Sequence, residues 1–180
     1  MRWRCTLAGL LASLAPSASA QATPPTPPPA CLIVYGHARN AGDAKDNEAW
    51  DRVNRVFNAQ VTQRLQDGGQ RAFALLFNAG VTEVAGAVAE LIALAQRQGC
   101  LRVVDTAVFA DAAAQTLVVR LRVHPVLGST GPRLRPAAAP RIGEPIYSSQ
   151  RDLDLNQRTL ERVNLAALAE QMVDDYLAKP

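Results

Sequence analysis

Two cysteines and two histidines carry most of the chemistry that this sequence offers. Cys31 and Cys100 are the cysteines beyond the first twenty residues, and the histidines are His37 and His124. A Cys31–His37 nucleophile pair is disfavoured, because a strand separates residues six positions apart by about 20 Å. A zinc site from the two histidines and nearby carboxylates is an alternative, but zinc ligands usually come in tighter local pairs. We therefore expect no metal.

The two cysteines are predicted to form a disulfide. Each stands before an apolar run that reads as a strand, over 32–36 and 101–109. If these strands are parallel neighbours, the two sulfur atoms meet at one edge of the sheet. Closing a loop of about 70 residues would stabilise the fold by roughly 4 kcal/mol in the chain-entropy treatment. Two buried, unpaired thiols are the alternative.

A small basic cluster is the most distinctive polar feature. Arg120, Arg122 and His124 alternate with apolar residues in the run 116–126, so they share one face of a predicted strand. Arg102 is expected beside them on the neighbouring strand. This strip would bind an acidic partner, such as an envelope protein or an anionic cell-wall or membrane surface. A solvated sheet face with no partner is the alternative.

The common catalytic and nucleotide-binding motifs are absent from the sequence. It contains no P-loop, no GxGxxG, no GxSxG, no HExxH and no CxxC. We therefore predict a protein that is not an enzyme and carries no cofactor. A small hydrolase with an unrecognised site is the second interpretation, and a solute-binding module is the third.

The first twenty residues have the pattern of a cleaved secretory signal peptide. Arg2 and Arg4 precede a short apolar core at 6–14, and small residues lead up to Ala20. We predict cleavage after Ala20 and a periplasmic protein. Residues 21–30, rich in proline, are predicted to form an extended linker.

Composition and charge are those of one ordinary globular domain, predicted over 31–180. The chain has 180 residues, of which 48% are hydrophobic and 19% charged. It carries 19 basic against 16 acidic side chains, and two of the basic ones, Arg2 and Arg4, belong to the predicted signal peptide. The remainder is nearly neutral, so nucleic acid is a poor candidate partner. No stretch after the signal peptide is apolar enough for a transmembrane segment.

These residues must be positioned by alternating strands and helices. Periodicity predicts an α/β (α+β) fold with one mixed sheet of about five strands and three helices, in the order β-α-β-α-β-β-β-α. The strands are expected at 32–36, 70–78, 101–109, 116–126 and 144–151, and the helices at 48–66, 83–98 and 156–178.

Apolar side chains predict which faces of the first two helices are buried. Asp46 or Asn47 would cap the first helix, and Trp50 and Phe57 lie at core spacing along it, with ligand binding as the alternative role. The inner face of the second helix is expected to include Val84 and Val88.

Three segments resemble one group of bacterial envelope proteins: VNRVFNAQVTQRLQDGG, LIALAQRQGCLRVVDTAVF, and GEPIYSSQRDL followed by NLAALAEQMVDDYLA. The first is a helix that ends in glycine, the second is a helix that leads into a strand, and the third is a hairpin end followed by a terminal helix. This pattern is similar to that of the TolB N-terminal domain, the curli-secretion protein CsgG and the lipoprotein activators of penicillin-binding proteins. The lipid-attachment cysteine of many such proteins is missing here. The resemblance implies a non-enzymatic envelope accessory protein that binds another protein through a sheet edge or a helical face.

Overall fold

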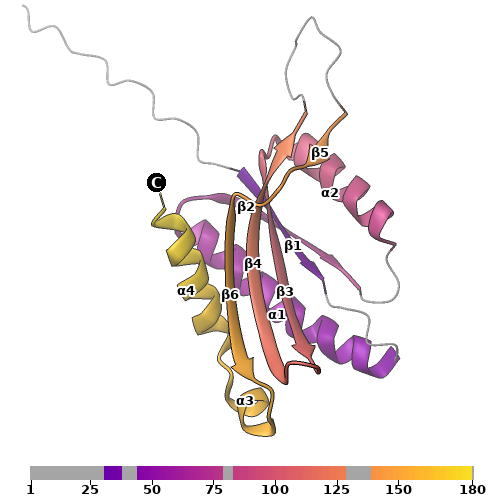
Figure 1. Ribbon diagram of the computed structural model, residues 1–180. Helices are drawn as coiled ribbons and strands as arrows, with labels where there is room; N and C mark the ends of the chain where they lie inside the picture. The colour runs from indigo at the N-terminus through magenta and orange to yellow at the C-terminus, as the bar shows by residue number, and fades with distance from the viewer. Residues whose placement is uncertain (1–30, 38–43, 79–82, 129–138, 180) are drawn as a thin grey trace, which may run out of the picture.

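The computed structural model describes residues 31–37, 44–78, 83–128 and 139–179, so the predicted signal peptide and linker lie outside the described residues. The predicted order of strands and helices is confirmed (Figure 1). The elements are β1 (Cys31–His37), α1 (Ala44–Asp67), β2 (Arg71–Phe77), α2 (Val84–Gln98), β3 (Arg102–Asp111), β4 (Thr116–Leu127), β5 (Arg141–Ile142), β6 (Tyr147–Asp154), α3 (Gln157–Arg162) and α4 (Leu165–Leu177).

One mixed sheet holds the molecule together. The strands lie in the order β2-β1-β3-β4, and both β5 and β6 pair with β4. β1 is parallel to β2 and to β3, whereas β3 and β4 form an antiparallel hairpin and β6 is antiparallel to β4. The connections β1–α1–β2 and β2–α2–β3 run in opposite directions along the sheet, so their helices cover opposite faces.

The hydrophobic patterns of β1 and β4 explain their places in the sheet. β1 is apolar without alternation and lies between two strands, with Leu32 packed on the α1 side and Ile33 on the α2 side. β4 alternates as predicted: Leu121 and its odd-numbered neighbours join the core under α1 and α4, while Arg122 and its even-numbered neighbours point to the other face. The main core therefore lies on one side of the hairpin only.

Three helix predictions need correction. α1 already begins at Ala44, so neither Asp46 nor Asn47 is its N-cap. The inner face of α2 is Ala87, Leu91 and Ala95, while Val84 and Val88 are exposed. α2 is apolar on most of its sides, so its sequence pattern does not single out the buried face.

The third correction concerns the predicted single C-terminal helix, which is broken into α3 and α4. Val163 adopts an extended conformation, and the side-chain oxygen of Asn164 accepts a hydrogen bond from the Ala167 backbone N–H, which starts α4 anew. Asparagine is among the best N-cap residues, so a helix boundary here is favoured locally.

A buried asparagine fastens α1 to the hairpin. The Asn54 side chain, 2% exposed, accepts a 2.7 Å hydrogen bond from the Val108 N–H and donates a 2.8 Å bond to the Val108 carbonyl. β1 pairs with β3 only as far as Thr106. Beyond that point, the Asn54 carboxamide takes the place of a neighbouring strand residue and satisfies both polar groups of the Val108 backbone.

We expect Asn54→Ala to lower the free energy of unfolding by about 3 kcal/mol, because it leaves two buried backbone groups of Val108 unpaired. Urea unfolding followed by circular dichroism measures this change. Gln63→Ala, at an exposed position of the same helix, is the control and should change stability by less than about 0.5 kcal/mol. Equal effects of the two substitutions would contradict the role given to Asn54.

Candidate functional site

One face of the hairpin carries the predicted basic cluster. α1 and α4 pack on the opposite face, and α2 covers β1, β2, the beginning of β3 and the end of the sheet near β5. No helix among the described residues covers the outer part of β3, β4 and β6 on the α2 side of the sheet. We call the polar side chains of this region the arginine face. They are Asp105, Arg120, Arg122, His124, Ser148 and Gln150.

The carboxylate of Asp105 is the centre of the arginine face, and its side chain is only 8% exposed. Arg122 donates to Asp105 Oδ2 from Nη2 at 2.6 Å and from Nε at 3.0 Å. Nη2 of Arg120 lies 4.0 Å from the same oxygen, and Nε2 of His37 lies 3.3 Å from Oδ1. Residues from β1, β3 and β4 thus meet at one buried carboxylate.

These neighbours decide the ionisation of Asp105. Burial by itself would raise its pKa, but hydrogen bonds and charge from His37 and Arg122 outweigh burial and lower the pKa to about 2. Desolvation, followed by the negative charge of Asp105, raises the pKa of the neighbouring Tyr35 to about 12. The centre of the face therefore keeps a carboxylate and a neutral phenol over the physiological pH range.

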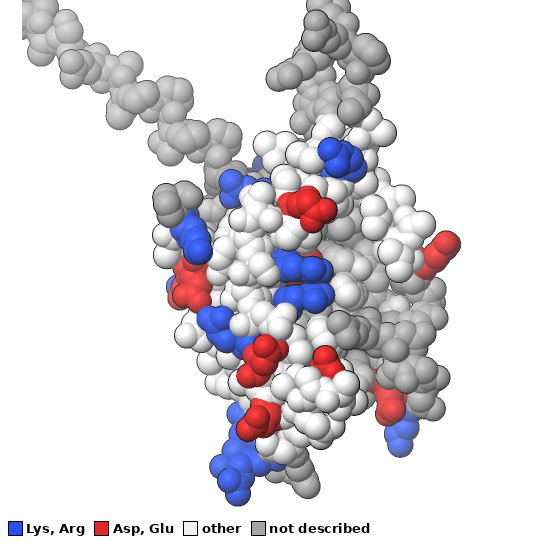
Figure 2. Space-filling view, viewed as in Figure 1, with Lys and Arg blue, Asp and Glu red and all other residues white. Residues whose placement is uncertain are grey.

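The two arginines are held in place by these contacts. The Arg122 side chain is 33% exposed, and the Arg120 side chain is 19% exposed, with its guanidinium carbon 5.6 Å from the centre of the Phe109 ring. Space-filling Figure 2 shows basic side chains at the centre of this face, with acidic side chains above and below them. Binding of a partner by this face, as opposed to solvation alone, stays a prediction.

His124 lies on the same face, and its contact is local. Its Nδ1 is 2.9 Å from the carbonyl oxygen of Gly143, just after β5. A proton on Nδ1 makes this a hydrogen bond that ties β4 to the segment between β5 and β6.

The structure separates Arg102 from the other predicted binding residues. Arg102 pairs with Pro125 across the hairpin and therefore points to the helix side of the sheet, where its Nη1 donates a 2.8 Å hydrogen bond to the Tyr176 hydroxyl. The expectation that Arg102 lies beside Arg120 and Arg122 is wrong. The register of the hairpin decides this: Arg102 lies opposite Pro125 and therefore shares the face of the odd-numbered residues of β4, whereas Arg120 and Arg122 point to the other face.

Cys31 and Cys100 are joined by a disulfide, with their α-carbons 4.5 Å apart. β1 and β3 are parallel neighbours, as the pairing required. Cys31 is 8% exposed and Cys100 is 0% exposed, so the bond lies under α2 beside Leu91 and Ala95. It fastens the start of the central strand at the end of the sheet away from Asp105.

Sequence reasoning missed Asp105 and His37 as parts of the site. It gave Asp105 no role, although this residue interrupts the apolar run Val103–Phe109. A lone acid between buried residues requires a buried partner, and the opposing cations of β4 supply it. Among the described residues, no group of three or more metal-ligating side chains comes together.

Comparison with known proteins gives fold-level likeness only. No family model and no curated protein matches this sequence. Among solved structures, the chain is similar to the PelC dodecamer from Paraburkholderia phytofirmans, with 12% identity, a TM-score of 0.41, and coverage of 88% of this chain and 92% of that one. It is also similar to a lipoprotein from Neisseria meningitidis, with 16% identity, a TM-score of 0.40, and coverage of 84% and 99%.

The described helices are all too short or too polar to cross a membrane. The likeness to the TolB, CsgG and activator group stays a prediction from the sequence.

The lowered pKa of Asp105 predicts a specific acid sensitivity. Its pKa of about 2 in the folded protein lies below the value of 3.8 that is ordinary for an aspartate side chain. The stabilisation is therefore present above about pH 4 and is lost as the pH falls through about 2. We expect the free energy of unfolding to fall by about 2 kcal/mol more for the wild type than for Asp105→Asn between pH 5 and pH 2.

Urea unfolding at a series of pH values measures both curves. Asp152→Asn, at an exposed carboxyl of β6, is the control and should keep the wild-type slope. Parallel curves for the wild type and Asp105→Asn would contradict the assigned ion pair.

Proposed function

We propose that this protein is a non-enzymatic accessory protein of the cell envelope, and that its arginine face binds an acidic group of another envelope protein. The observation that carries the proposal is the pair Arg120 and Arg122 around the buried Asp105, on the part of the sheet face that no described helix covers. The predicted signal peptide and the disulfide support an extracytoplasmic location, where such bonds persist.

The orientation of the Arg122 guanidinium favours binding of a partner's carboxylate over contact with solvent alone. Arg122 uses Nε and Nη2 for Asp105, so its two Nη1 hydrogens have no partner among the described residues. A guanidinium whose orientation is already set loses less conformational entropy when it binds a carboxylate. Arg120 adds a second cation within the same cluster.

The surroundings favour a single acidic group over an extended anionic surface. Ser148 and Gln150 of β6 lie beside the arginines as uncharged, exposed neighbours. The exposed Asp152 follows Gln150 on the same face of β6, and Figure 2 shows acidic side chains on either side of the basic centre. These carboxylates would repel a polyanionic polymer or membrane surface, whereas one acidic side chain of a partner fits between them.

A hydrolase is the second candidate, since His37 next to Asp105 has the arrangement of a base and its orienting acid. The nearby buried serine, Ser149, points to the helix side of the sheet and its hydroxyl accepts a hydrogen bond from Arg151. It therefore does not face His37. Tyr35 packs beside that histidine, with ring centres 5.0 Å apart, but burial and Asp105 raise the pKa of its phenol to about 12. Among the described residues, no hydroxyl or thiol is hydrogen-bonded to His37.

Photocrosslinking in the native host tests the proposed function. A benzoylphenylalanine at Gln150, on the arginine face, should capture an envelope protein that the same probe at Gln63 of α1 does not capture. Combined substitution Asp105→Asn and Arg122→Gln removes the ion pair as a unit and should lower the capture about tenfold, which corresponds to about 1.4 kcal/mol of binding. Arg55→Gln, exposed on α1, is the matched control.

Capture that is equal from Gln150 and Gln63, or that does not depend on Arg122, would contradict the proposal. So would purified protein that hydrolyses ester or peptide substrates at an enzyme-like rate, with loss of the rate in His37→Ala.

A further inference from the structure

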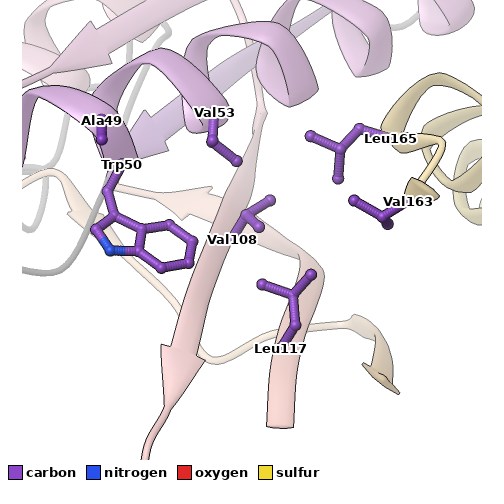
Figure 3. A pocket seen from close by; sticks show the side chains of 7 residues that line it. All are labelled: Ala49, Trp50, Val53, Val108, Leu117, Val163 and Leu165. Atoms are coloured by element: carbon purple, nitrogen blue, oxygen red, sulfur yellow. The ribbon is translucent and has the colours of Figure 1, made fainter. Parts of the chain in front are cut away.

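A cavity of about 430 Å³ lies on the helix side of the sheet, away from the arginine face (Figure 3). Trp50 and Val53 of α1 form one wall. The side chains of Val163 and Leu165, on either side of the break between α3 and α4, form the other. Val108 and Leu117, which are 1% and 2% exposed, belong to the hydrophobic core and form the floor.

The broken helix creates this cavity. In a continuous helix, residues two positions apart point in different directions, so Val163 and Leu165 would not line the same space. The extended conformation of Val163 and the N-cap at Asn164 turn both side chains toward α1. The departure from the predicted single helix therefore has a local consequence: an opening into the core.

The lining of the cavity is mainly apolar. All of the lining side chains are apolar except for the Trp50 indole nitrogen. The backbone N–H and carbonyl of Val108, on the floor, are already bonded to Asn54. A ligand that enters must be apolar along its buried length, because any polar group there would lose its hydrogen bonds to water.

Its size favours a chain over a single side chain. The volume is roughly three times that of the ~150 Å³ apolar cavity that takes up one benzene molecule. One leucine or phenylalanine side chain of a partner protein would leave most of the space empty. A flexible aliphatic chain of about a dozen carbons would fill it, with its polar end in solvent at the mouth beside the exposed Ala49.

We propose that the cavity between α1, the β3–β4 hairpin and the α3–α4 break binds an acyl chain of about a dozen carbons. Binding uses the other face of the sheet, so it is independent of the partner assigned to the arginine face. The chain could reach the protein as a free fatty acid or as part of a membrane lipid.

Fluorescence of Trp50 provides a direct assay. The sequence has two tryptophans, Trp3 and Trp50. Trp3 lies in the predicted signal peptide, so protein that begins at Gln21 carries Trp50 alone and reports on the cavity wall. Bromododecanoic acid, whose bromine quenches tryptophan on contact, should quench Trp50 saturably at concentrations below its micelle threshold. Binding should tighten roughly fourfold for each added methylene from octanoate to dodecanoate in competition, as burial of each methylene predicts.

A matched pair of variants on α1 separates the cavity from the general surface. Ala49→Phe places a ring at the cavity mouth and should weaken binding at least tenfold. Ala59→Phe, at another exposed alanine of the same helix, should leave it unchanged. Val163→Phe, which fills the cavity from the opposite wall, is a second test if Ala49→Phe alters the circular dichroism spectrum.

Vesicles of brominated phosphatidylcholine form the second arm. Quenching by vesicles as well as by the free acid identifies a membrane lipid as an accessible source, and quenching by the free acid alone identifies a soluble one. Quenching that does not saturate, does not depend on chain length, or is unchanged in both filling variants would overturn the proposal.

Discussion

A carboxylate that is buried in the sheet must be paired, and this requirement organises the polar half of the molecule. The Asp105 side chain is 8% exposed at the centre of β3, where an uncompensated charge would cost several kcal/mol. His37 from β1 and Arg122 from β4 approach it from the two neighbouring strands. The pairing therefore fixes the register of three strands and the orientation of the guanidinium groups at the same time.

Side chains along β3 and β4 point alternately to the two faces of the sheet, so one hairpin carries two different surfaces. On the helix side, Val108 and Leu117 continue the core and form the floor of the apolar cavity. On the other side, Arg120 and Arg122 surround Asp105. Polar contacts dominate one face and apolar contacts dominate the other, so a change on either side can be studied without removing the other surface.

The sequence was most informative where periodicity and burial agree. The alternating run of β4 and the continuous apolar run of β1 predicted both strands and their environments, and Gly99 ends α2 in the left-handed conformation expected of a terminal glycine, with φ of 69°. The element order followed from these patterns. In contrast, α2 is apolar on most sides, and its buried face depends on packing with β1 and β3 that no local pattern contains.

The parts that were missed depend on contacts between distant residues. The break at Val163 arises from a competing cap at Asn164 inside an otherwise helical pattern. Asp105 and Asn54 act through partners on other strands and helices, 17 and 54 positions away along the chain. Arg102 was assigned to the wrong face because the sequence does not give the pairing register of the hairpin, which places Arg102 opposite Pro125.

The measurement that tests this account most directly is a double-mutant cycle between Asp105 and Arg122. The free energies of unfolding of the wild type, Asp105→Asn, Arg122→Gln and the double variant give the coupling between the two side chains. A buried, doubly hydrogen-bonded pair predicts a coupling of about 2 kcal/mol at pH 7 that vanishes near pH 2, where Asp105 becomes protonated. Additive effects within about 0.4 kcal/mol at pH 7 would show that the carboxylate does not hold the arginine, and would contradict the account.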